Sequence, residues 1–141
     1  MGVIPWSPLA SGRLTRDWDE VTTRSETDEY SRRLYADEDQ SIVESVADIA
    51  SKRGIPRAQV VLAWMLRKPV ISATIVGVMR LARFHDALDA VDVELSSEEI
   101  EELERPYEPH GITGHCDTTY LWHLAVTAPA YERDQAPAMS E

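Results

Sequence analysis

The chain has 141 residues, of which 43% are hydrophobic and 28% are charged, a composition typical of one globular domain rather than of a disordered or fibrous protein. Its 25 acidic side chains outnumber its 14 basic ones, for a formal net charge of −11. That charge repels phosphate backbones and anionic headgroups, so we expect neither nucleic acid nor a membrane as a partner. A single cysteine, Cys116, and an N-terminus without basic residues favour a cytoplasmic location.

The chain starts with a short apolar run over residues 1–6, which ends at Trp6 and predicts a buried β-strand. Such a strand needs partners on both sides, so we expect that sequence preceding it is missing. Residues 7–37 are polar and weakly periodic. They predict a long loop and then a short helix over residues 27–34.

Two helices are predicted in the middle of the chain. From Asp39 to Arg53 apolar residues recur at the spacing of one helix face, and Gly54 supplies the stop. Pro56 then stands where a helix tolerates proline, at its first turn. The second helix, over residues 58–66, is apolar nearly all round, which indicates that it is buried.

A second strand and a third helix follow. The short β-branched run over residues 71–76 predicts the strand. The helix is expected over residues 80–90, with Leu81, Phe84 and Leu88 facing the core. Two strands separated by helices describe βα units of a parallel sheet.

A fourth helix is marked by the capping box Ser96-x-x-Glu99, and we expect it to run to about Arg105. The periodic pattern ends after Pro106. The last residues, 129–141, have the composition of a disordered tail.

Four blocks of residues resemble the aldo/keto reductase family. Residues 2–15 (GVIPWSPLASGRLT) resemble the family's seventh-strand motif, and residues 75–88 (IVGVMRLARFHDAL) resemble its eighth strand and the helix after it. Between them, residues 56–66 (PRAQVVLAWML) are similar to the penultimate barrel helix, and residues 106–110 (PYEPH) to the ending of many members. The blocks stand in the family's order at plausible spacing.

The resemblance implies an α/β fold. The family's (β/α)₈ TIM barrel typically needs about 250 residues, so we expect a partial barrel here. It would comprise the last two βα units, the seventh and eighth strands onward, with a C-terminal helix and an irregular tail. Residues 1–115 are assigned to the C-terminal part of a reductase barrel, and residues 116–141 stay unassigned as an expected disordered tail.

The resemblance also implies NADP(H) as the cofactor. Trp6 matches the family's aromatic residue that stacks on the nicotinamide. The hydroxyls of Ser7 and Ser11 and the backbone amide of Leu9 lie close together in the sequence. In a barrel, the loops after strands seven and eight favour phosphate binding, so these three groups are expected to serve the pyrophosphate.

The second half of the expected cofactor site follows the second strand. It includes Gly77 and two arginines, Arg80 and Arg83, at the start of a helix, where the helix N-terminus and the guanidinium groups attract anions. By resemblance, Arg83 matches the contact to the 2′-phosphate or adenine, and Asp86 matches the acid at the adenosine end. The family's Asn at the position of Ala87 is absent.

The chemistry of the family lies elsewhere in its chain. Members reduce aldehydes and ketones by hydride transfer from NADPH, while a Tyr tuned by Asp and Lys donates the proton and a His orients the substrate. These four residues lie on early strands, outside the matched blocks, so we predict no catalytic residue in this chain. No metal site is predicted either, because no zinc-ligand spacing joins His110, His115, Cys116 and His123.

Three functions therefore remain open. The first is a truncated or split reductase segment that carries the NADP(H) phosphate and adenosine half-site and is active only with the N-terminal barrel half, which is either supplied by another chain or lost through truncation. The second is a non-catalytic module that binds or self-associates, because unpaired strands and an apolar inner face favour association. The third is a degenerate remnant without a stable fold. Trp6, Ser7 and Arg83 favour the first.

Overall fold

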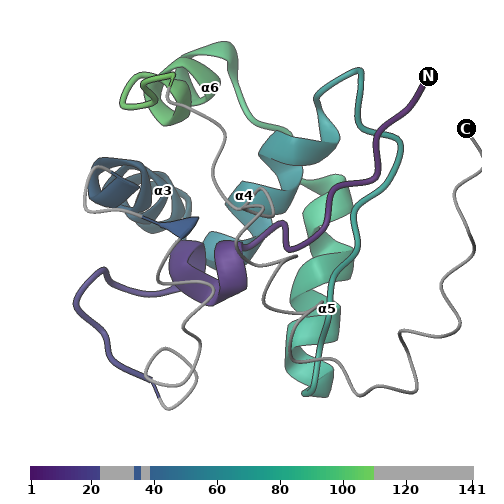
Figure 1. Ribbon diagram of the computed structural model, residues 1–141, viewed down its shortest axis with the longest axis horizontal. Coiled ribbons are helices and arrows are strands. Elements are labelled where there is room, and N and C mark those ends of the chain that lie inside the picture. Colours follow the sequence, from purple (N-terminus) through teal and green to yellow (C-terminus); the bar gives the residue numbers. More distant parts are fainter. Residues whose placement is uncertain (23–33, 36–38, 110–141) are drawn as a thin grey trace, which may run out of the picture. The chain divides into compact units, whose positions relative to one another are not determined.

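The computed structural model describes residues 1–22, 34–35 and 39–109, and its regular elements there are helices (Figure 1). In chain order these are η1 (Ala10–Thr15), α3 (Gln40–Arg53), α4 (Arg57–Leu66), α5 (Leu81–Asp89), η3 (Ala90–Asp92) and α6 (Ser97–Glu104). The helix predicted over residues 27–34 lies almost wholly outside the described residues, and the predicted tail lies entirely outside them. Within the described ranges, no helix is long and apolar enough to cross a membrane.

The end of α3 follows the prediction. Gly54 has a left-handed backbone, with φ of 66°, and its N–H donates to the carbonyls of Ala50 and Ser51. Glycine takes this conformation without the steric penalty of a Cβ atom. Pro56 is the N-cap of α4 rather than its first residue, so the second helix begins at Arg57.

The core lies where α3, α4 and α6 pack together. Ile49 and Val60 are fully buried at its centre. Leu95 and Leu103 bring the segment around α6 onto the same cluster, and Leu9 and Leu14 of the N-terminal region pack against its edge. The helix predicted to be buried, α4, is buried along Ala58–Ala63.

The capping box of α6 also joins this helix to α3. The Ser96 hydroxyl accepts from the Glu99 N–H at 3.2 Å, and the Glu99 carboxylate accepts from the Ser96 N–H at 2.7 Å. The guanidinium of Arg53 donates to the same carboxylate at 2.6 Å and to the Glu94 carbonyl at 2.7 Å. The last turn of α3 is thereby fixed to the first turn of α6.

The two predicted strands are reduced to one parallel bridge, between Val3 and Ile71. The Val3 N–H donates to the Val70 carbonyl at 2.8 Å, and the Ser72 N–H donates to the Val3 carbonyl at 2.9 Å. Figure 1 shows the purple N-terminal segment beside the teal segment that precedes α5. The parallel direction agrees with βα units, but the expected burial is wrong, because Ile4 is 59% exposed. Each segment has one neighbour among the described residues, and a parallel strand is normally covered on both sides.

The predicted burial of the apolar face of α5 is also wrong. We expected Leu81, Phe84 and Leu88 to face the core, but they are 71%, 45% and 51% exposed. The helix itself forms, one residue later than its first predicted position, and packs against α4 and η3. Periodicity predicted an amphipathic helix correctly, but the part of the chain that the structure describes places no layer over this apolar face.

Candidate functional site

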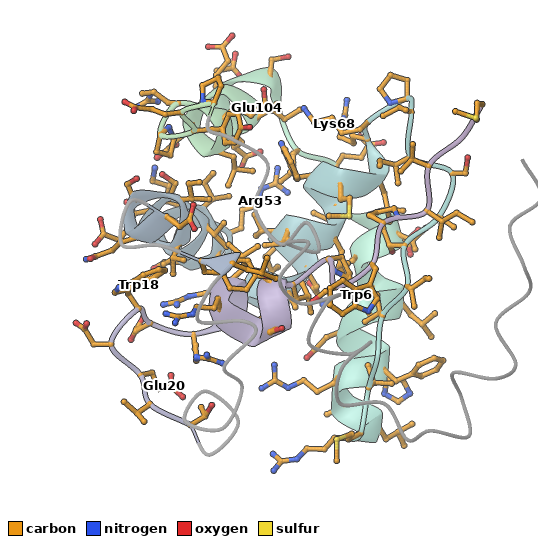
Figure 2. The ribbon with its side chains drawn as sticks, in the orientation of Figure 1. Trp6, Trp18, Glu20, Arg53, Lys68 and Glu104 are labelled. Carbon is orange, nitrogen blue, oxygen red and sulfur yellow. The ribbon has the colours of Figure 1, made fainter. Side chains whose placement is uncertain are left out.

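A pocket of about 660 Å³ lies where the two extended segments lead into η1 and α5. It brings together nearly all of the residues predicted for the cofactor, namely Trp6, Ser7, Leu9, Ser11, Gly77, Arg80 and Arg83. Asp86, the remaining one, is half-buried on α5 and is not among the lining residues. Trp6 is 68% exposed, so much of its indole is accessible at this pocket (Figure 2).

One wall of the pocket is a turn with an unusual backbone. Ser7, Ala10 and Ser11 have φ values of 52°, 50° and 54°, followed by Gly12 at 87°. Each non-glycine residue in this left-handed region costs roughly 1–2 kcal/mol. The surrounding structure must offset this strain, and strain of this kind clusters at functional sites.

Hydrogen bonds within the turn explain how it holds its shape. The Ala10 N–H donates to the Ser7 carbonyl at 3.0 Å, and the Gly12 N–H donates to the Leu9 carbonyl at 2.8 Å. The Ser11 N–H donates to the Ser7 hydroxyl oxygen at 3.2 Å. Ser7 therefore serves the turn as an acceptor, and its O–H hydrogen is directed away from the Ser11 amide.

A second wall is the N-terminus of α5. Arg80 is its N-cap, in an extended conformation and without a side-chain cap. The N–H groups of Arg83 and Phe84 donate to the Arg80 carbonyl at 3.0 and 3.2 Å. The amides before them, in the first turn of a helix, point out of its N-terminal end and have no acceptor within the helix. Together with the partial positive charge of the helix end and two exposed guanidinium groups, this wall attracts anions in an otherwise acidic chain.

Sequence reasoning missed the floor of the pocket. Ala58 and Leu62 line it from α4, and Gly12 and Thr15 line it from η1. The spacing of Ala58 and Leu62 places them on one helix face. Only the packing of η1 against α4 shows that this face meets the pocket.

No candidate metal centre accompanies the pocket. Among the described residues, no group of three or more His, Cys, Asp and Glu side chains is arranged to hold an ion. The sequence candidates for such a site, from His110 to His123, lie outside the described residues.

A sequence model of the aldo/keto reductase family matches residues 1–108. The chain belongs to the aldo/keto reductase family. The family's fold is the (β/α)₈ barrel, and its members are reductases that normally use NADP(H). The family match extends over the pocket, both extended segments and all the helices described above.

Fungal proteins are among its relatives. A Schizosaccharomyces pombe protein provisionally named an aryl-alcohol dehydrogenase is 44% identical over 117 residues, which cover 81% of this chain and 33% of the relative. The versiconal hemiacetal acetate reductase of Aspergillus parasiticus is 39% identical, over 79% of this chain and 34% of its own. An aldo-keto reductase of Metarhizium robertsii is 41% identical, over 82% of this chain and 32% of the relative. The chain thus spans about a third of the length of these relatives.

Proposed function

We propose that this chain is the C-terminal part of an NADP(H)-dependent aldo/keto reductase and binds the phosphate and adenosine end of the cofactor. The observation that carries the proposal is the pocket itself. Its two walls are the left-handed turn over residues 7–12 and the N-terminus of α5, which carries Arg80 and Arg83. The N-terminus of α5 is a backbone arrangement that suits anions, and the turn brings the Ser7 and Ser11 side chains to the same pocket.

The residues present fit the charge of the cofactor. NADPH carries a pyrophosphate and a 2′-phosphate, and when bound it supplies the hydride for carbonyl reduction. Arg80 and Arg83 would neutralise phosphate oxygens, with the planar guanidinium able to bind two oxygens at once. The exposed indole of Trp6 would cover one face of the nicotinamide and exclude water from it. At Gly77 a Cβ atom would meet nothing within 4 Å, so the backbone there leaves room for a ligand to approach.

Carbonyl reduction itself would require residues outside this chain. The Tyr, Asp, Lys and His expected of the family belong to its early strands, and a chain that supplies the N-terminal barrel half would bring them to the pocket. This proposal favours a split or truncated reductase of the cytoplasm over a degenerate remnant. It rests on the retained pocket and on a relative's identity of 44%.

One observation favours a second function, a module that self-associates. Leu81, Phe84 and Leu88 make an exposed apolar stripe on α5, and the paired segments expose Val3 and Ile4. An apolar surface of this kind drives association. Sedimentation at rising concentration tests this reading, and Leu88→Ser, which lies outside the pocket lining, should weaken the association if the stripe is the interface.

Titration with NADPH and NADH, followed by calorimetry and tryptophan fluorescence, tests the main proposal. Arg83→Ala should weaken NADPH binding by about 10- to 100-fold, because a charge-assisted hydrogen bond contributes about 1.5–3 kcal/mol. Gly77→Ala should weaken binding while leaving the fold unchanged, since Gly77 lines the pocket and an added methyl group would meet nothing within 4 Å. Arg105→Ala, an exposed arginine at the C-cap of α6, is the matched control. Absence of saturable binding, or equal effects of Arg83→Ala and Arg105→Ala, would refute the proposal.

A further inference from the structure

The segment that leaves the pocket turn is tied to α4 by one arginine. Arg57, the first residue of α4, donates from its Nη2 atom to the carboxylate of Asp17, two residues after η1. The Arg57 side chain is 22% exposed and that of Asp17 is 79% exposed. On the same segment, the Arg13 guanidinium stacks over the Trp18 ring, 4.6 Å from its centroid. Figure 2 shows Trp18 on this loop, beside η1.

This ion pair joins the segment that follows η1 to the start of α4, and both η1 and α4 contribute residues to the pocket. The strained turn over residues 7–12 runs into η1, and η1 packs against α4. The residue after Arg57 is Ala58, which lines the pocket. Strained backbone persists only where neighbouring contacts hold it. The exit of the turn is held by Arg57, whereas Leu9 and Leu14 hold it from the core side.

The environment of Arg57 also distinguishes it from a surface arginine. Its Nη1 atom is buried and has no hydrogen-bond partner among the described residues. A side chain placed only to solubilise the surface would not adopt such a position. The guanidinium is held against the fold by its contact with Asp17, at the junction of η1 and α4.

We propose that Arg57 is a positioning residue, which holds the exit of the Ser7–Gly12 turn against α4 through Asp17 and so fixes the shape of the pocket wall that this turn forms. The expected effect on NADPH affinity rests on the proposed function. The expected effect on the order of the Ser7–Gly12 turn is independent of that function, so a separate readout is used for each.

The first readout is amide hydrogen exchange over residues 9–15, compared with exchange in α3, and the second is affinity for NADPH. Asp17→Asn and Arg57→Met should accelerate exchange over residues 9–15 by about two- to fivefold, and weaken NADPH binding by a similar factor, as expected for an ion pair whose carboxylate is exposed. Arg57→Lys, which keeps the charge, should retain most of the protection from exchange over residues 9–15 and most of the affinity for NADPH. Glu102→Gln is the matched control, because it breaks an ion pair of 2.7 Å between α6 and Lys52 of α3. It should change neither the exchange over residues 9–15 nor the affinity for NADPH.

The outcomes are distinct. Unchanged exchange over residues 9–15 in Arg57→Met would overturn the inference. So would acceleration that is equal in α3, because that result indicates a general loss of stability. If the unmodified chain binds no NADPH but exchange over residues 9–15 responds as stated, the proposed function fails and the positioning role stands.

Discussion

Replacing Glu99 by Gln tests the junction between α3 and α6. The Glu99 carboxylate accepts from the Arg53 guanidinium and from the Ser96 N–H, at 2.6 and 2.7 Å. Gln retains an oxygen that can accept from the Ser96 N–H, so the capping box survives. The substitution therefore removes mainly the ion pair with Arg53.

The magnitude follows from the protonation of the same carboxylate. The hydrogen bonds from Arg53, together with a smaller contribution from Ser96, lower the pKa of Glu99 from 4.5 to about 2. That difference bounds the contribution to the free energy of unfolding at about 3 kcal/mol. The side chains of Arg53 and Glu99 are 31% and 22% exposed, and solvent screening reduces the expected loss at pH 7 to about 1–2 kcal/mol.

The pH dependence has a definite sign. A carboxylate whose pKa is lowered by folding contributes stability above its ordinary value, and that contribution disappears as pH falls toward the folded value. For Glu99 the window runs from 4.5 down to about 2. The stability difference between the unmodified chain and Glu99→Gln should therefore fall to less than half of its pH 7 value at pH 3.

Urea unfolding followed by circular dichroism at pH 7 and pH 3 measures this difference. Glu101→Gln, an exposed position on the same helix, controls for the loss of one negative charge. A loss at pH 7 below about 0.5 kcal/mol, the size of effect expected at an ordinary surface position, would refute the reasoning. A loss that is equal at both pH values would refute it as well.

Four further substitutions test the packing and the backbone. Gly54→Ala should lower the free energy of unfolding by about 1 kcal/mol, because its φ of 66° disfavours a Cβ atom although nothing lies within 4 Å of that position. Ile49→Ala, in the fully buried core, should cost about 2–5 kcal/mol, whereas Leu81→Ala, which is 71% exposed, should stay within about 0.5 kcal/mol in urea melts. Gly2→Ala would place a Cβ 1.8 Å from the Ser72 hydroxyl, which can move away by a change of rotamer, so the two extended segments should stay paired and amide exchange at Val3 should be nearly unchanged.

Local signals in the sequence determined much of the helical structure. The αL preference of Gly54 and the reciprocal hydrogen bonds of Ser96 and Glu99 depend on neighbours within a few residues, so the ends of α3 and α6 were predictable. The family motifs likewise marked Ser7 and Arg83, which the structure places at one pocket. Ser7 lies within a short turn and Arg83 within the first turn of α5, so the local backbone sets the position of each within its own segment.

Only the tertiary structure decided which faces are covered. The repeat that includes Leu81 shows that α5 is amphipathic, but a periodic pattern carries no information about whether another layer lies against it. The β-branched run at Ile71 favours extended backbone, yet a strand also requires neighbours, and one bridge to Val3 is what the described residues provide. The pocket floor at Ala58 and the Arg57–Asp17 pair join segments about 40 residues apart, and such contacts are set by packing rather than by local preference.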